Sequence, residues 1–404
     1  MFTFQLSGWH RTDEPGMTND TYNILMYSHD TYGLGHIRRT MAIARTLVQP
    51  DVNILILTGS PIAGRYNLPQ GVDFVRVPGM IKQSNTVYAP HSIKVDPKQA
   101  VAIRRNIITA TTRTFKPDLF IVDKVPTGLK GEIKPTLQWI RKHCPQTRVV
   151  LGLRDILDNA HNTINEWKRK QFVKVLRELY TEIWVYGEQE LYDPISEYSI
   201  PEDIAEKTFF TGYIPRRKPK TRPPKSREKL VVVTIGGGGD GYPVLDNYLS
   251  MLEQNGSVDF KTLMVTGPFL PGHMIDTLAD RARALGVRFT AFVRNLEKKI
   301  AQADLVISMG GYNTLCEILS QKKVSLIIPR DNPREEQLIR ARVFASRGLV
   351  DYIKWSDLSP QAMRTKVDAM LANPRPFEEA MSGFTMTGLD FMRNRLDEFR
   401  KEQE

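Results

Sequence analysis

The chain has 404 residues, enough for two domains that each bury their own core, and its 41% hydrophobic and 25% charged residues are typical of a globular protein in solution. No apolar run approaches the ~20 residues of a membrane-spanning helix, and only two cysteines, Cys144 and Cys316, are present. This composition excludes a disulfide framework and a cysteine-based metal cluster, and it predicts a cytoplasmic protein.

The N-terminal segment and one basic stretch are predicted to lie outside the folded domains. Residues 1–20 are polar and lack the apolar core of a signal peptide, so we expect a disordered extension with Met17 as a candidate start. Residues 216–229 hold eight Lys or Arg and one Glu, which supply +7 of the formal net charge of +11. Prolines in this stretch favour a solvated interdomain linker, and no aromatic residues alternate with the basic ones, so no nucleic-acid partner is expected.

Apolar runs that alternate with helical patterns occur in both halves of the chain. Such runs predict parallel strands covered by helices on both faces, with ligand at the carboxyl ends of the strands. The expected strands are 23–27, 52–57, 72–77, 119–122, 149–153 and 183–186, followed by 230–235, 262–265, 287–292, 305–308, 324–328 and 350–353. We therefore expect domains at 21–215 and 230–376, joined by the linker 216–229, and an amphipathic helix at 377–404.

Three glycine-rich turns each separate a predicted strand from a predicted helix, at 33–36, 236–241 and 310–311. Backbone N–H groups at such turns and at helix starts form sites for phosphate. Glu317, on the first turns of the third helix, could reach ribose hydroxyls. The second turn also satisfies the dinucleotide pattern G-x-G-x-x-G, but no acid ends a strand about 20 residues later, and a dehydrogenase leaves the third turn unexplained.

These motifs resemble those of GT-B glycosyltransferases, most closely the branch of peptidoglycan N-acetylglucosaminyltransferases that act on lipid-linked muramyl-peptide. The resemblance covers about residues 23–355 and rests on the Gly-His loop at 33–36, Thr-Gly-x-x-Pro at 211–215, the glycine loop at 236–241, the Phe292-Val293 pair, the helix start at 311–317 and the Glu336-Gln337 pair. The family usually has Gln-Gln or Asp-Gln at the last pair, so the identity of the sugar stays open.

The resemblance implies an α/β fold of the GT-B type, with two facing doubly wound Rossmann-like domains and a C-terminal helix returning to the first domain. It implies the following donor-binding residues: Gly33, Gly35, Gly236, Gly237, Gly238, Gly239, Asp240, Phe292, Val293, Gly310, Gly311, Tyr312, Asn313, Thr314, Glu317, Glu336 and Gln337.

Two absent motifs favour a metal-independent, inverting enzyme without a cofactor. The chain has no Asp-x-Asp metal clamp, and Met309 stands where the Glu-x7-Glu pattern of many retaining enzymes would need its first glutamate. Backbone amides and helix dipoles would then offset the diphosphate charge. The expected reaction moves a hexosyl unit from a nucleotide-sugar donor, a UDP-sugar above all, to an unidentified acceptor hydroxyl. The resemblance and the basic linker together suggest a lipid-linked acceptor and peripheral association with an anionic membrane.

An inverting transfer needs a base that deprotonates the acceptor hydroxyl. His36 is the first candidate because imidazole accepts a proton near neutral pH, and Asp123 and Asp155 are the alternatives at the ends of two predicted strands. His29 and Asp30 are expected to support the site or to contact the acceptor. Two other functions stay open: a non-hydrolysing nucleotide-sugar epimerase, which needs no acceptor, and a non-catalytic nucleotide-sugar binder that regulates a partner.

Overall fold

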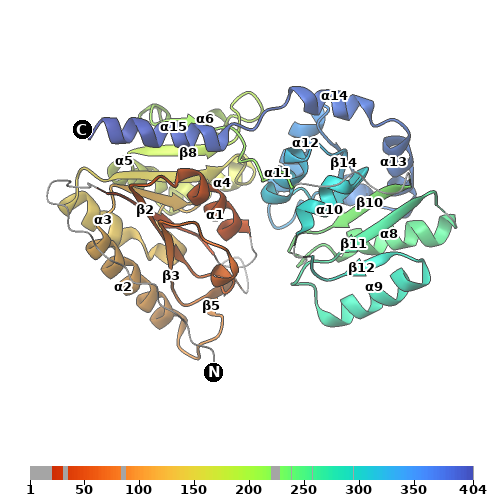
Figure 1. The fold of residues 1–404 in the computed structure, drawn as a ribbon, viewed down its shortest axis with the longest axis horizontal. Coiled ribbons are helices and arrows are strands. Elements are labelled where there is room, and N and C mark those ends of the chain that lie inside the picture. Colours follow the sequence, from red (N-terminus) through yellow and green to blue (C-terminus); the bar gives the residue numbers. More distant parts are fainter. Residues whose placement is uncertain are drawn as a thin grey trace.

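The computed structural model describes residues 21–30, 35–82, 88–219, 228–237, 239–256, 258–293 and 295–403. The extension predicted at 1–20, the glycines Gly33 and Gly238, and linker residues 220–227 lie outside these ranges. The described chain forms two lobes side by side, each built on one main parallel sheet (Figure 1).

The first lobe contains a seven-stranded parallel sheet in the order β3-β2-β1-β6-β7-β8-β9. Its strands are β1 (Tyr22–Tyr27), β2 (Val52–Thr58), β3 (Val72–Arg76), β6 (Leu119–Asp123), β7 (Arg148–Arg154), β8 (Glu182–Tyr186) and β9 (Thr208–Phe210), and a separate antiparallel hairpin is formed by β4 (Met80–Lys82) and β5 (Tyr88–Pro90). Six of these strands were expected from apolar runs, whereas β9 and the hairpin were not.

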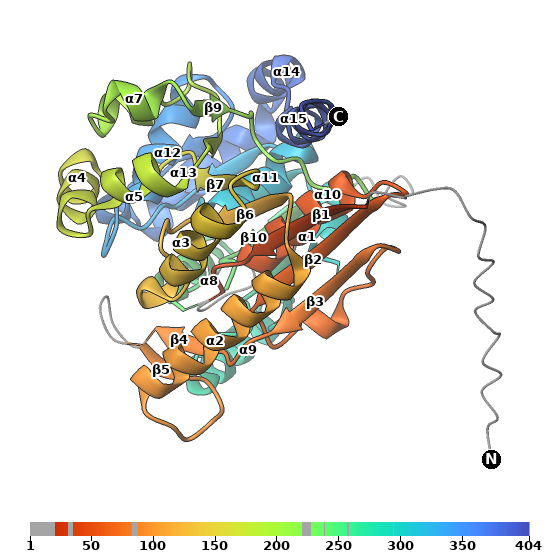
Figure 2. The same ribbon diagram turned by 90° about the vertical axis from the view of Figure 1, so that its left-hand side faces the viewer.

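Helices cover both faces of the first sheet, as its continuous apolar strands require. They are α1 (Gly35–Leu47), α2 (Pro97–Phe115), α3 (Lys134–His143), α4 (Ala160–Arg169), α5 (Phe172–Leu179), α6 (Pro194–Glu197) and α7 (Glu202–Ala205), with the 3-10 turns η1 (Ala63–Arg65) and η2 (Leu129–Gly131). Every residue of β6 is buried. Figure 2 looks onto this lobe, with α2 and α3 in front.

The second lobe contains a six-stranded parallel sheet in the order β12-β11-β10-β13-β14-β15. Its strands are β10 (Lys229–Thr234), β11 (Phe260–Val265), β12 (Arg288–Thr290), β13 (Leu305–Ser308), β14 (Ser325–Ile327) and β15 (Asp351–Tyr352). Its helices are α8 (Tyr242–Asn255), α9 (Gly272–Ala284), α10 (Leu296–Gln302), α11 (Tyr312–Ser320), α12 (Glu336–Ser346) and α13 (Pro360–Ala372), with the 3-10 turn η3 (Trp355–Asp357).

The C-terminal segment forms two helices rather than the single helix expected, α14 (Arg375–Gly383) on the second lobe and α15 (Gly388–Lys401) on the first (Figure 1). The break lies where this segment crosses the chain that leaves the first lobe: Thr387 Oγ1 donates to the carbonyl oxygen of Thr211 at 3.0 Å, and Gly388 N donates to that of Tyr213 at 3.1 Å. Helix α15 then packs on α1. The tail therefore returns to the first domain, as predicted.

Each sheet has one topological switch point, where the strand order reverses direction. In the first sheet it lies between β1 and β6, and in the second between β10 and β13. Open α/β sheets bind ligands in the crevice outside the carboxyl ends of the strands at such points. The loops that follow these four strands therefore mark where a ligand site is to be sought.

Candidate active site

His36 and Asp123 meet at the switch point of the first sheet. Asp123 is the last residue of β6, and His36 is the second residue of α1, the helix that follows β1. His36 Nδ1 and Asp123 Oδ2 are 2.5 Å apart, and Arg39, one turn further along α1, forms an ion pair with the other carboxylate oxygen of Asp123. Arg39 and Asp123 are buried, while 15% of the His36 side chain is exposed.

This arrangement keeps the imidazole of His36 neutral and oriented. Burial lowers the pKa of His36 to about 4, against the opposing effect of Asp123. Burial alone would raise the pKa of Asp123, but Arg39 and His36 hold it well below its usual range, so the carboxylate stays ionised. An ionised carboxylate at Nδ1 fixes the tautomer that protonates Nδ1, which leaves Nε2 as the proton acceptor. Asp123 thus acts on His36, and His36 retains a basic nitrogen.

The second switch point carries the two glycine-rich loops predicted to hold phosphate. Residues 236, 237 and 239 follow β10 and are exposed, and a Cβ added to Gly236 would lie 3.6 Å from Thr314 Oγ1 on α11, so the two loops adjoin. Helix α11 begins after Gly311 without a side-chain cap, which leaves its first backbone N–H groups available to an anion. Gly310 has φ = 79°, and a Cβ there would lie 2.6 Å from Ile327, so the turn requires glycine.

The two switch points touch each other. A Cβ at Gly35 would lie 2.3 Å from Asn313 Nδ2, so the start of α1 approaches the start of α11 without room for a side chain. Asn313 also accepts a hydrogen bond from Arg216 Nη2 at 2.5 Å, and the backbone N–H of Arg216 donates to Ser320 Oγ at 2.8 Å. At least this first residue of the basic linker is therefore docked on the second domain rather than free in solvent.

A cleft of about 1650 Å³ opens beside this contact and is lined by both lobes. Glu317 lines it from α11 and pairs with Arg38 of α1 at 3.1 Å, a contact between the lobes. Phe292 lines it from the loop after β12, and at 53% exposure it is one of two large apolar side chains that the described chain exposes. Val293, next to it, is half-buried. An exposed aromatic side chain near a buried carboxylate suits the base and ribose of a nucleotide.

Arg330 contacts three of the predicted donor-binding residues. Its Nε lies 2.9 Å from Asp240 Oδ2, and its Nη2 donates to Glu336 Oε1 at 2.8 Å. With its amide oriented to satisfy both groups, Gln337 accepts from Arg330 Nε at 3.1 Å and donates to the carbonyl oxygen of Met309 at 2.5 Å. The other oxygen of Glu336, Oε2, is buried and has no hydrogen-bond partner among the residues that the structure describes.

Two predicted site residues have their side chains in the contact between the lobes. Asp155, after β7, accepts from Arg340 Nε at 2.8 Å and Nη2 at 2.7 Å, and both side chains are 1% exposed. Tyr213 also donates to Asp155 at 3.2 Å. The ring of Tyr312 stacks on Tyr213 at a centroid distance of 6.0 Å and is 1% exposed, so only its backbone can face a donor. The structure therefore does not place Asp155 beside His36 as an open base.

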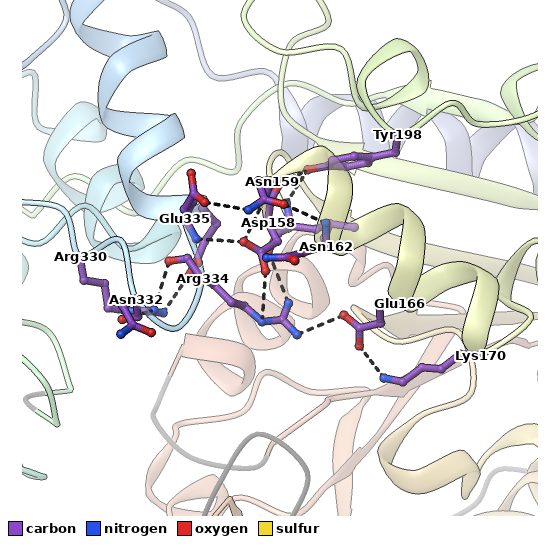
Figure 3. A network of polar contacts seen from close by, with 12 residues as sticks. Asp158, Asn159, Asn162, Glu166, Lys170, Tyr198, Arg330, Asn332, Arg334 and Glu335 are labelled. Carbon is purple, nitrogen blue, oxygen red and sulfur yellow. Dashed lines mark hydrogen bonds and ion pairs between the residues drawn. The ribbon is translucent and has the colours of Figure 1, made fainter.

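A second set of polar contacts joins the lobes around the loop that precedes α12 (Figure 3). Arg334 Nη2 donates to Glu166 Oε2 at 3.2 Å, Asn159 Nδ2 donates to Glu335 Oε1 at 2.7 Å, and the backbone N–H of Glu335 donates to Asp158 Oδ1 at 2.9 Å. This loop leads directly into Glu336, so contacts with the first domain fix the start of α12.

The supporting residues Arg38, Arg39, Arg330 and Arg340 were not predicted from the sequence. Arg39 could have been found, because it follows His36 by three residues on a helix and so shares its face. Arg340 could not, because nothing in the sequence connects it with Asp155, 185 residues away. His29 and Asp30 are buried beside the site. Burial lowers the pKa of His29 well below its usual range and raises the pKa of Asp30 to about 6.

The second lobe is similar to a known family of domains. Residues 240–392 match the glycosyltransferase family 28 C-terminal domain. Over 180 residues it is 23% identical to UDP-N-acetylglucosamine--N-acetylmuramyl-(pentapeptide) pyrophosphoryl-undecaprenol N-acetylglucosamine transferase of Bacillus cytotoxicus, a match that covers 44% of this chain and 49% of that relative. The chain thus spans about half the length of the curated relative it matches.

Solved structures with the same two-lobed architecture extend over nearly the whole chain. The glycotransferase of kitacinnamycin superposes with a TM-score of 0.65 at 14% identity, covering 94% of this chain and 99% of that one. MurG of Acinetobacter baumannii superposes with a TM-score of 0.59 at 13% identity, with the same coverage. The predicted GT-B fold is confirmed.

Within the described residues, no helix combines the length and apolar character needed to cross a bilayer.

Proposed function

We propose that the protein is a glycosyltransferase that transfers a hexosyl unit from a nucleotide-diphosphate sugar, a UDP-sugar above all, to an acceptor hydroxyl, with inversion and without a metal ion. The observation that carries the proposal is the contact between the two switch points, which brings a neutral, carboxylate-oriented His36 next to an uncapped helix start and two glycine loops. The family 28 domain in the second lobe supports the same assignment.

In this mechanism the second domain binds the donor. The diphosphate lies on the backbone N–H groups of residues 236–239 and of the start of α11, where the helix dipole favours negative charge. Phe292 lies against the nucleotide base, and Glu317 accepts hydrogen bonds from the ribose, which requires Arg38 to move away from it. Glu336 accepts hydrogen bonds from sugar hydroxyls, and the amide of Gln337 can both accept from and donate to them.

The first domain supplies the base. His36 Nε2 removes the proton from the acceptor hydroxyl as its oxygen forms a bond to the anomeric carbon. The bond between that carbon and the diphosphate oxygen breaks, and the nucleotide diphosphate leaves with the electron pair. Asp123 stabilises the imidazolium that forms, and Arg39 keeps Asp123 ionised. We assign Asp155 to the contact between the lobes rather than to the chemistry, because Arg340 occupies both of its oxygens.

The acceptor class is taken from the relatives. The Bacillus cytotoxicus protein is named for transfer to a pyrophosphoryl-undecaprenol intermediate, and we extend a lipid-linked acceptor to this chain on that resemblance. Peripheral association with an anionic membrane through residues 217–227 is part of the same proposal, since Arg216 and Lys229 are engaged elsewhere, Lys229 Nζ through a bond to the carbonyl oxygen of Leu371 at 2.9 Å.

Isothermal titration calorimetry with UDP tests the donor site. Glu317→Ala removes a charged hydrogen-bond acceptor worth about 1.5–3 kcal/mol, so UDP affinity should fall by about tenfold or more. Glu297 lines the same cleft from α10, and Glu297→Ala serves as the matched control with unchanged affinity. Equal UDP binding by Glu317→Ala and wild type would show that the donor site is wrongly placed. Incubation with a nucleotide sugar alone, which an epimerase would convert, tests the alternative isomerase function.

A further inference from the structure

Two cations beside the proposed catalytic base have no acidic partner. Lys124 follows Asp123 at the end of β6, and Arg154 is the last residue of the adjacent strand β7. Among the described residues neither side chain forms a hydrogen bond or an ion pair, and Arg154 Nε is buried without a partner. Cations that are half-buried or more are normally paired, and these two carry positive charge that Asp123, Asp155 and Glu336 offset only from a distance, without an ion pair in the described part of the chain.

Several other cations around the site are neutralised within the protein, whereas Arg216, which donates to Asn313 and to the carbonyl oxygen of Arg38, has no carboxylate partner among the described residues. Arg39 pairs with Asp123, Arg340 with Asp155, and Arg330 with Asp240 and Glu336. Lys124 and Arg154 remain half-buried, with part of their surface accessible to a ligand. Lys124 and Arg154 therefore place two such charges close together, at the carboxyl ends of two neighbouring strands.

That place adjoins the proposed base, because Lys124 directly follows Asp123, which contacts His36. The groups that act electrostatically on Lys124, or on which it acts, come from both lobes: Asp123, Arg154, Arg334, Glu336, Glu166, His29 and His36. Lys124 is thus within electrostatic reach of both His36 and Glu336. During transfer the group between the base and Glu336 is the transferred sugar.

The backbone at Lys124 is left-handed, as it also is at Lys116, Lys130 and Lys322 in the described chain. The φ of Lys124 is 70°, a left-handed conformation that is uncommon and costly for a residue with a long side chain. Within the described part of the chain, a buried acceptor, Glu336 Oε2, and a buried donor, Arg154 Nε, both lack hydrogen-bond partners although their charges are opposite. A ligand that offers hydroxyl groups to the first and an anion to the second would satisfy both.

We propose that Lys124 and Arg154 bind a carboxylate on the transferred sugar, so that the donor is a nucleotide-activated hexuronic acid; this inference rests on the proposed function. A hexuronate carries hydroxyl groups that can donate to Glu336 Oε2. Its planar carboxylate matches the fork of an arginine and accepts from an ammonium group as well. A neutral hexose would leave both cations without a counter-charge.

The inference sets the sign of a pH effect. Burial, together with Arg154 and Arg334, lowers the pKa of Lys124 to about 7, so its ammonium group is mostly neutral near pH 8 and mostly charged near pH 6. The sugar carboxylate, with an ordinary pKa of about 4, stays ionised throughout. The preference for a carboxylated donor should therefore strengthen as the pH falls from about 8 to about 6.

Calorimetric titration of the full chain with UDP, UDP-glucose and UDP-glucuronate tests the inference. We expect UDP-glucuronate to bind about tenfold or more tightly than UDP-glucose near pH 6.5, as a charge-assisted hydrogen bond implies. Lys124→Gln and Arg154→Gln should each reduce this ratio about tenfold, with UDP affinity unchanged. The exposed residues Lys134 and Arg141 provide matched controls, since Lys134→Gln and Arg141→Gln should leave the ratio as in wild type.

The remaining outcomes separate this inference from the function on which it rests. Equal binding of the two nucleotide sugars, or a preference that survives both substitutions, overturns the inference while the donor site stands. Acetate or inorganic phosphate can also be added to the protein saturated with UDP-glucose. If either anion raises the melting temperature, and the rise is lost in Lys124→Gln and Arg154→Gln, the two cations bind the acceptor. That result would also overturn the inference. Failure of wild type to bind UDP removes the proposed function and the inference together. If a Gln variant does not fold, Lys124→Arg and Arg154→Lys, which keep the charge, must retain the preference.

Discussion

Replacing one member of the buried Asp155–Arg340 pair should destabilise the protein far more than replacing an accessible contact between the lobes. Asp155→Ala removes two charge-assisted hydrogen bonds, at 2.8 and 2.7 Å, from a guanidinium that is 1% exposed. At about 1.5–3 kcal/mol each, these bonds account for about 3–6 kcal/mol, which agrees with the ~3–5 kcal/mol cost of an uncompensated buried charge. Burial lowers the pKa of Arg340 and Asp155 raises it, and the net shift is upward. The arginine therefore stays protonated.

A double-mutant cycle measured by urea unfolding tests this reasoning. Asp155→Ala and Arg340→Ala should each lower the free energy of unfolding by about 3–5 kcal/mol, and the double variant should lose at least 2 kcal/mol less than the sum, since no charge is then left unpaired. Arg334→Ala is the control. Its side chain is 33% exposed, so its ion pairs should contribute about 0–1 kcal/mol. The proposed role of the Asp155–Arg340 pair would be refuted if each single variant unfolded with a free energy within about 1 kcal/mol of wild type, or if the losses were strictly additive.

Three further predictions concern catalysis and the membrane. His36→Ala should lower kcat by about 10²–10⁴-fold with donor affinity within a few-fold, and EDTA should leave wild-type activity unchanged; near-normal turnover or a metal requirement would reject the mechanism. Because the pKa of His36 is lowered to about 4, the base stays neutral as the pH falls, so kcat should hold down to about pH 5 and drop near pH 4. A variant with all Lys and Arg of 217–227 changed to Gln should lose salt-sensitive co-sedimentation with anionic vesicles. If wild type also stays in the supernatant, residues 217–227 act only as a linker.

The fold could be predicted from the sequence because its strands are continuous apolar runs. Every expected strand in both halves has a counterpart, and residues 119–122, expected as a strand, lie in the fully buried β6. The glycine loops could be predicted for a related reason, since a turn between a buried strand and a helix constrains the backbone locally. The break between α14 and α15 could not, because it depends on the tail crossing the chain near Gly212, which lies far away in sequence.

The site was predicted less completely because its charges are organised across the two domains. Position at a strand end suggested Asp123 and Asp155 equally, yet one orients His36 and the other is bound to Arg340 of the second domain. Glu317 was expected to face a ribose, and in the structure it faces Arg38. The sequence indicates which residues stand at the ends of strands, but the partner of each charge depends on how the lobes pack, which no local pattern encodes.

The distribution of charge gives the two lobes different tasks. In the proposed mechanism the second lobe would bind the diphosphate through neutral groups, namely the glycine loops and the uncapped start of α11, while Arg330 holds Asp240. Such groups would bind any nucleotide diphosphate equally well and would not select one sugar over another. The first lobe contributes His36 and the unpaired cations Lys124 and Arg154. Substitutions in the glycine loops should therefore change donor affinity for all sugars, whereas substitutions at the ends of β6 and β7 should change which sugar is transferred.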